Sequence, residues 1–520
     1  MASLLKWWFA SSKPTTPERI PTDTVIPLNR YDDSRANRNI SIGFTMQFDS
    51  VLDAERLSSA LWTLLERPGW RKLGARLRLN ESDKLEYHIP AQYTKDRPPI
   101  NYTHESHDMS LSQHPIGAKF PRANGSLQVI GDLEPLRDIT IPKNNTTVLA
   151  DWIYTDKAQL GLHIVNFTDA TLVTLTWMHT LLDAMGRHAL LKAWTAVLDG
   201  REDDVPEFWG YDFDPLEKLG APGVRQAASA TESAKEDEFV LKDQQVKGWN
   251  LYKFIFNHKC ESFFYPNEET RILVMPASYF ATLKKRALQD LESADTSLLT
   301  MSFKDPKNPK PFISDGDILC AWLTRLMASS NPSILASPGS RTIHILNAFG
   351  MRDLLSNTAP QLIPRGTAYI GNCVSAMHTF LSQQDFLSLP LGHLAAHFRR
   401  DLVLQGTRAQ VEANQALAKA NGGQQILYGD GDMAMMVFSN WLKAKFFDTD
   451  FSPAIVKDGG KGAGKGKPVY IHVHGTIGKG AAVRGTGSCV GKDAEGNLWL
   501  GAVLRKECVE GFVKAVEGMR

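Results

Sequence analysis

One histidine, His179, lies where an apolar, β-branched run ends and a helix-forming run begins. Residues 171–178 are typical of a buried strand, and residues 187–198 have the apolar spacing of a helix. Asp183 follows within the same junction, and Gly186 provides either room for a neighbour or an unusual backbone angle. Because imidazole titrates near neutral pH, a histidine held at such a junction can take a proton from a hydroxyl group. The alternative is a packed structural histidine followed by an aspartate that caps the helix.

Predicted strands and helices alternate along the whole chain. The 520 residues are too many for one hydrophobic core, so at least two domains are expected. The stretch 220–237 is rich in small and charged residues, as an exposed linker is. We therefore expect an N-terminal domain over residues 1–225, a linker over 226–250 and a C-terminal domain over 251–520. A continuous amphipathic pattern predicts one long helix around 394–419. Strands and helices in both halves predict the α/β class with mixed α+β sheets.

The charge balance argues against a polyanionic partner. Lys and Arg total 58 and Asp and Glu total 57, which gives a formal net charge of +1. No global field therefore favours nucleic acid or an anionic membrane. No stretch approaches the roughly 18 apolar residues that span a bilayer. The N-terminal apolar run is too short for a signal peptide. We expect a cytoplasmic protein with no membrane and no nucleic-acid partner.

Several motifs that suggest other chemistry are incomplete. The five cysteines are scattered without a C-x-x-C pair, which predicts neither a disulfide framework nor a zinc site, and we expect no bound metal. Residues 459–466 match G-x-x-x-x-G-K, but Gly466 replaces the Ser or Thr of a P-loop, and a strand follows where a helix is required. The lysines of this loop could still contact a phosphate group. The chain has no G-x-S-x-G elbow, so no serine-hydrolase site is predicted.

Further motifs occur after His179 in a fixed order. They are Ser314-Asp-Gly-Asp317, Asn347-Ala-Phe-Gly-Met-Arg352, Tyr369-Ile-Gly-Asn372, Ser439-Asn-Trp441 and Asp450-Phe451. Together with the H-x-x-x-D of His179 and Asp183, this set resembles the BAHD acyltransferase superfamily, in particular its fungal branch with trichothecene O-acetyltransferase-like members. The resemblance extends over residues 40–505. It departs from the family pattern where Ala184 replaces the Gly of H-x-x-x-D-G, and where residues 452–454 replace the last three residues of D-F-G-W-G.

The resemblance implies two similar chloramphenicol-acetyltransferase-like domains with a channel between them. His179 would lie in the middle of the channel as the general base for direct acyl transfer. The donor would be acyl-CoA, most commonly acetyl-CoA, and the acceptor a hydroxyl group of a small secondary metabolite such as a terpenoid or polyketide. The resemblance implies no permanently bound cofactor, and we expect a monomer.

The same resemblance assigns roles to residues around the histidine. Asp183, in an ion pair with Arg352, would hold the loop that orients His179. Gly186 and Asp450 would give further structural support. The candidates for contact with the phosphates of CoA are Lys461, Lys465 and Lys467.

Two other functions remain open. Condensation domains, which have the same superfold, take acyl groups from a carrier protein and prefer a second histidine directly before the catalytic one. Here Met178 occupies that position. A non-catalytic descendant that only binds a ligand is the second alternative, and the altered D-F-G-W-G segment motivates it.

Overall fold

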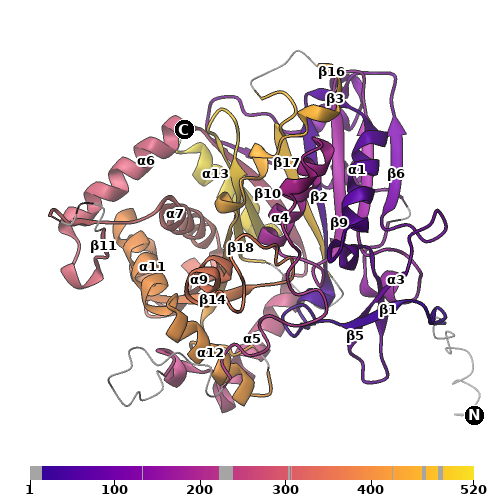
Figure 1. The fold of residues 1–520 in the computed structure, drawn as a ribbon. Coiled ribbons are helices and arrows are strands. Elements are labelled where there is room, and N and C mark those ends of the chain that lie inside the picture. Colours follow the sequence, from indigo (N-terminus) through magenta and orange to yellow (C-terminus); the bar gives the residue numbers. More distant parts are fainter. Residues whose placement is uncertain are drawn as a thin grey trace, which may run out of the picture.

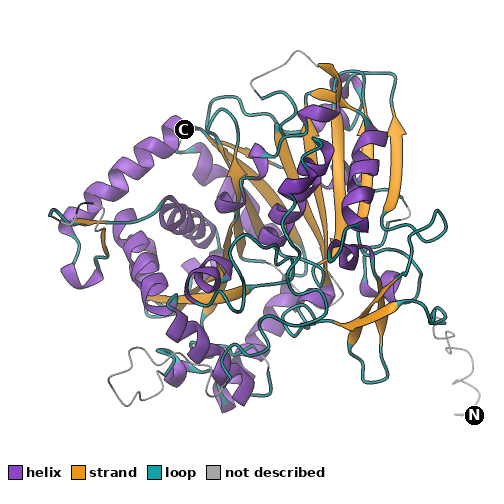
Figure 2. Ribbon diagram, viewed as in Figure 1, coloured by secondary structure: helices purple, strands orange, loops and turns teal. Residues whose placement is uncertain are grey.

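A computed structural model gives the fold of the chain (Figure 1). It describes residues 15–131, 133–143, 145–221, 238–302, 305, 307–423, 425–458, 464–477 and 484–519. Two large mixed sheets lie next to each other, and helices pack against both (Figure 2).

The first large sheet has five strands within the described residues. In spatial order they are β17 (Tyr470–Ile477), β2 (Ile40–Phe48), β9 (Thr171–Met178), β8 (Gly161–Asn166) and β6 (Asn101–Ser106). All neighbours are antiparallel except β6 and β8, which are parallel. Every residue of β9 is buried, as expected for a central strand with both faces covered. The strand that leads to His179 is therefore held in the core.

Two helices pack together beside this sheet, α1 (Ala54–Glu66) and α4 (Ala184–Leu198). Helix α1 begins at Asp53, whose side chain accepts a hydrogen bond from Arg56 N at 2.9 Å. Its apolar residues lie at helical spacing and are buried, so the helix packs through one face. Trp194 of α4 donates from Nε1 to Leu57 O at 3.0 Å, which fixes the two helices relative to each other.

The second large sheet has seven strands within the described residues. In spatial order they are β14 (Val374–Ser382), β13 (Thr342–Gly350), β15 (Ala434–Asn440), β18 (Thr486–Lys492), β19 (Leu498–Arg505), β10 (Glu268–Met275) and β7 (Gln128–Ile130). The pairs β13–β15 and β15–β18 are parallel. Helix α7 (Asp315–Ser329) packs against this sheet, and a capping box between Ser314 and Asp317 starts it. The predicted mixed α/β class is confirmed.

Smaller elements complete the fold. The strands of the small sheets are β1 (Thr24–Pro27), β5 (Leu85–Ile89) and β4 (Arg76–Leu79) in one, β3 (Ser50–Leu52) and β16 (Ile455–Asp458) in another, and β11 (Met301–Ser302) and β12 (Lys310–Pro311) in a third. The remaining helices are α2 (Arg137–Thr140), α3 (Leu149–Ile153), α5 (Gly248–Phe264), α6 (Ala277–Asp290), α8 (Pro332–Leu335), α9 (Arg352–Thr358), α10 (Gln383–Ser388), α11 (Leu391–Gln405), α12 (Arg408–Ala420) and α13 (Val509–Glu517).

The two halves of the chain exchange strands. Strand β7, from the N-terminal half, pairs with β10 at the edge of the seven-stranded sheet. In return, β17 from the C-terminal half pairs along its full length with β2, and β16 pairs with β3. The boundaries at residues 225 and 250 stay predictions, and the exchange joins the two halves across them. The helix expected around 394–419 is two helices, α11 and α12, because Thr407 caps a new start by accepting from Gln410 N.

Candidate active site

His179 lies directly after the last residue of β9, and its backbone is held on both sides. Its amide donates to Ile40 O at 2.8 Å, which continues the pairing of β9 with β2. Its carbonyl accepts from Asn372 Nδ2 at 2.9 Å. The side chain is half-buried, and Nδ1 is buried without a hydrogen-bond partner among the described residues. The end of the strand therefore fixes the backbone of His179, from which the imidazole projects.

The surroundings of His179 favour the neutral imidazole. Burial lowers the pKa of His179, because it removes water from the charged form. The positive charge of Arg187 lowers it further, while the carboxylate of Asp183 acts in the opposite direction. A neutral imidazole at pH 7 is the form that can accept a proton.

Asp183 is a buried carboxylate whose two oxygens have different partners. Oδ1 accepts from Met185 N at 3.0 Å and Gly186 N at 2.9 Å, which caps α4. Oδ2 accepts from Arg352 Nη1 at 2.8 Å and from Cys373 N at 3.0 Å. Although burial alone would raise the pKa of Asp183, the Arg352 guanidinium and the amide hydrogen bonds hold it below its usual value. Both oxygens of the Asp183 carboxylate are therefore hydrogen-bonded, to backbone amides and to Arg352.

Arg352 connects the loop after His179 to residues 369–371. Besides Asp183, its guanidinium donates to the carbonyls of Tyr369 at 2.9 Å and Ile370 at 3.3 Å, and also to Gly371 O. Gly186 brings α4 against the same segment, since a Cβ at this position would lie only 2.0 Å from Ile370 O. The structure thus brings together three of the residues expected from the sequence, Asp183, Gly186 and Arg352.

Asp32 is a residue of this site that the sequence analysis missed. Its Oδ1 accepts from Asn372 N at 2.7 Å and from Asn372 Nδ2 at 2.8 Å. The same Asn372 amide holds the carbonyl of His179, so Asp32 acts on the loop through Asn372. Burial raises the pKa of Asp32 to about 7, although both Asn372 hydrogen bonds and the charge of Lys72 act to lower it. We call the hydrogen-bonded group of His179, Asp183, Arg352, Asn372 and Asp32 the loop network.

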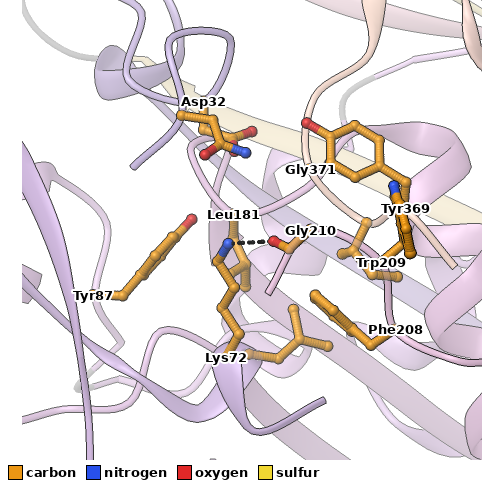
Figure 3. A pocket seen from close by; sticks show the side chains of 12 residues that line it. Asp32, Lys72, Tyr87, Leu181, Phe208, Trp209, Gly210, Tyr369 and Gly371 are labelled. Atoms are coloured by element: carbon orange, nitrogen blue, oxygen red, sulfur yellow. Dashed lines mark hydrogen bonds between the residues drawn. The ribbon is translucent and has the colours of Figure 1, made fainter. Parts of the chain in front are cut away.

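A small polar pocket with room for about one water molecule lies beside the loop network (Figure 3). Figure 3 shows Lys72, Tyr87 and Tyr369 reaching it from different sides, with Asp32 at its upper end. Lys72 Nζ donates to Gly210 O at 2.8 Å, and Tyr87 OH donates to Thr180 O at 3.1 Å, next to His179. Tyr369 OH is buried without a partner among the described residues. The pocket therefore has hydrogen-bonding capacity left for a polar ligand.

Comparisons with known proteins find relatives that match almost the whole chain. No family model matches the chain. "Acetyltransferase adrJ" of Penicillium roqueforti is 35% identical over 512 residues, which cover 96% of this chain and 97% of that relative. The chain belongs to the family of fungal acyltransferases that includes adrJ. The relatives do not all have the name of an enzyme. "Transcriptional regulator calD" of Penicillium decumbens is 37% identical over 504 residues, which cover 96% of both chains.

The fold of this fungal acyltransferase is also that of a solved structure. The crystal structure of F. sporotrichioides TRI101, complexed with coenzyme A and T-2, matches with a TM-score of 0.63. It is 13% identical, and the match covers 94% of this chain and 97% of that chain. The expected two-domain acyltransferase fold is confirmed. Among the described residues, no helix is both long and apolar enough to cross a bilayer, and no group of three or more His, Cys, Asp or Glu could hold a metal ion.

A buried arginine lies on the helix that follows His179. Arg187, in the first turns of α4, places its guanidinium 4.0 Å from the ring centre of Phe44, 4.2 Å from that of Phe446 and 4.9 Å from that of Trp441. Nε and Nη2 have no hydrogen-bond partner among the described residues. Burial lowers the pKa of Arg187 to about 9. Because the aromatic faces attract a cation, they hold this charge close to His179.

The residues of the altered D-F-G-W-G segment lie apart from the loop network. Asp450 is exposed, and its Oδ1 accepts from Ser452 N at 2.8 Å. Of the three candidate CoA lysines, Lys461 lies outside the described residues. Lys465 is exposed and forms an ion pair with Asp458 at 2.5 Å, and Lys467 is half-buried. Contact of these lysines with CoA stays a prediction.

Proposed function

We propose that the protein transfers an acyl group from acyl-CoA to a hydroxyl group of a small acceptor, with His179 as the general base. The loop geometry supports this most, because the backbone of His179 is tied at both amide and carbonyl while burial favours the neutral ring. Relatives named as acetyltransferases support the reaction class. The structure of TRI101 with coenzyme A supports acyl-CoA as the donor.

In the proposed reaction, the neutral imidazole of His179 accepts the hydroxyl proton as the acceptor oxygen attacks the thioester carbonyl carbon. A C–O bond forms, and the tetrahedral intermediate then expels the CoA thiolate as the C–S bond breaks. The imidazolium returns its proton to the thiolate, which leaves an ester, free thiol and neutral His179. Such direct transfer needs no Ser or Cys nucleophile. General-base help contributes about 10²–10⁴-fold, and holding both substrates together contributes further.

For the acceptor, we propose a hydroxylated secondary metabolite such as a terpenoid or polyketide. The polar pocket beside the loop is lined by hydrogen-bonding side chains and has room for about one water molecule, so it fits the hydroxyl end of an acceptor and not the whole molecule. Lys72 Nζ has a single hydrogen bond in the described part of the chain, to Gly210 O, and can donate further ones. Loops that line a binding site usually set the specificity of a scaffold that several proteins share.

The two alternatives have less support. A carrier-dependent condensation reaction would favour a second histidine at position 178, where the Met178 side chain is instead buried in the core. A non-catalytic role is motivated by the name of the relative calD, and it requires that the loop network serve binding alone.

A thiol-release assay separates these functions. With acetyl-CoA and a panel of hydroxylated acceptors, we expect the wild type to release free CoA thiol and His179→Ala to be slower by about 10²–10⁴-fold. The matched control is His188→Ala, which removes a nearby histidine that belongs to α4, and this variant should keep the activity. If the wild type releases no thiol across the panel, and labelled acetyl-CoA yields no acylated product with an extract of the source organism, the non-catalytic function is favoured.

A further inference from the structure

Helix α5 packs on the protein through its polar side. Lys253 forms an ion pair with Asp432, and Asn257 Nδ2 donates to Gly431 O at 3.1 Å. One turn further on, Glu261 pairs with Arg505 at 3.1 Å. None of the 17 residues of the helix is buried. Leu251, Phe254 and Cys260 are half-buried, but the other apolar side chains of the helix are exposed, which is unusual for a helix on a globular protein.

The opposite side of α5 presents large aromatic residues to solvent (Figure 1 labels the helix). Trp249 is 80% exposed and Phe263 is 79% exposed, and Tyr252 and Phe256 are exposed as well. At 100° per residue, these four side chains lie within about 60° of the helix circumference. Ile255 and Phe264 flank them and are also exposed. We call Trp249, Tyr252, Phe256 and Phe263 the aromatic face.

A lysine lies beside the aromatic face. Lys259 is exposed and lies between Ile255 and Tyr252 around the helix. Glu261 is the single carboxylate of α5, and it is on the protein side, paired with Arg505. The exposed side therefore combines aromatic and basic residues without an acidic one, although the whole chain has a net charge of only +1.

The residue types of the aromatic face indicate what covers it. Trp and Tyr have amphipathic rings that suit the headgroup layer of a lipid bilayer. A Lys at the edge of such a face keeps its ammonium in water. Lys259 is exposed and supplies a charge complementary to acidic headgroups.

We propose that α5 docks the protein on an anionic lipid surface. The helix axis lies in the plane of the membrane, the aromatic face enters the headgroup layer, and Lys259 contacts acidic lipid headgroups. The polar contacts of Lys253, Asn257 and Glu261 keep the helix attached to the protein while it binds. Such docking does not depend on the proposed reaction, and it would place the enzyme where apolar acceptors accumulate.

Vesicle co-sedimentation of the full chain tests the proposal. We expect the wild type to sediment with phosphatidylcholine/phosphatidylserine vesicles and only weakly with phosphatidylcholine alone. The double variant Trp249→Ser/Phe256→Ser should reduce the binding constant at least about tenfold, because two inserted rings are lost. Lys259→Glu should weaken binding to the anionic vesicles at least about fivefold.

The matched control is Val403→Ser/Leu404→Ser, which removes two exposed apolar side chains from α11 and should bind like the wild type. Circular dichroism and the thermal midpoint verify that each variant is folded. The proposal is overturned if the wild type stays in the supernatant with anionic vesicles, or if the double variant binds as well as the wild type. A wild-type dimer that the double variant dissociates, without vesicle binding, would assign the face to a second copy and also overturn it.

Discussion

Removal of the Arg352 side chain tests whether the loop network holds the site. Arg352→Met keeps the length of the side chain but leaves the buried carboxylate of Asp183 without its cation. Breaking a buried ion pair in this way costs about 3–5 kcal/mol. Asp183 keeps its three backbone amide donors, so we expect a loss near 3 kcal/mol. In a chain of 520 residues, a loss of this size lowers the thermal midpoint by about 3 °C.

The same variant should change how stability depends on pH. In the wild type the pKa of Asp183 lies below its usual value of 3.8, so its contribution is complete above pH 3.8 and is lost as the pH falls through the lowered pKa. Without Arg352, burial dominates and raises this pKa above 3.8. The ionised carboxylate then destabilises the variant at neutral pH. The difference between variant and wild type should therefore narrow as the pH falls from 7 towards 4.

Thermal midpoints at several pH values, together with hydrogen exchange at the amides of residues 185, 186 and 373, measure both effects. Arg365→Met is the matched control, because Arg365 is an exposed arginine with a hydrogen bond to Asn357. It should change stability by less than about 0.5 kcal/mol. If Arg352→Met retains the wild-type midpoint, exchange rates and thiol-release activity, the loop network does not hold the site.

Three further variants examine the site. Gly186→Ala would place its Cβ 2.0 Å from Ile370 O, so we expect a loss of about 3 kcal/mol or more and of activity; a thermal midpoint equal to the wild type would contradict this close approach. Arg187→Met removes a charge that lowers the pKa of His179, so the acid limb of the pH–rate profile should move to higher pH, and an unmoved limb would refute the electrostatic role. Burial raises the pKa of Asp32 to about 7, so its ionisation costs stability as the pH rises from 4 to 7. Asp32→Asn should therefore compare more favourably with the wild type at pH 8 than at pH 5, and an equal difference at both pH values would contradict the shift.

The local part of the site could be predicted from the sequence. The strand before His179 and the helix after it are visible because their apolar residues repeat at the appropriate period. Asp183 caps that helix from within the same short segment, as an aspartate at a helix start does. Arg352 lies 169 residues further along the chain, and only the resemblance to a family identified it.

The long-range part could not be predicted, because pattern does not specify pairing. Asp32 reaches Asn372 across 340 residues, and nothing in its short polar segment indicates burial. The apolar pattern of β17 indicates a strand but does not specify that it pairs with β2. Helix α5 was missed for a different reason. Most of the large apolar residues of α5 face solvent. A helix is recognised from hydrophobic periodicity on the assumption that its apolar residues face the core.

The altered D-F-G-W-G segment is separate from the loop network, and this bears on whether the enzyme is active. Phe451, the second residue of the segment, is buried, with its ring centre 5.4 Å from that of Phe48 and 5.0 Å from that of Trp194. Ser452–Ala454 form a short 3₁₀ turn next to it. Within the described residues, no hydrogen bond or ion pair connects residues 450–454 to His179, Asp183 or Arg352. Since the retained phenylalanine anchors the segment in the core, loss of Gly-Trp-Gly changes a turn and leaves the hydrogen bonds around His179 intact. The altered motif is therefore weak evidence against catalysis. Substitutions in the loop network are the ones expected to abolish activity.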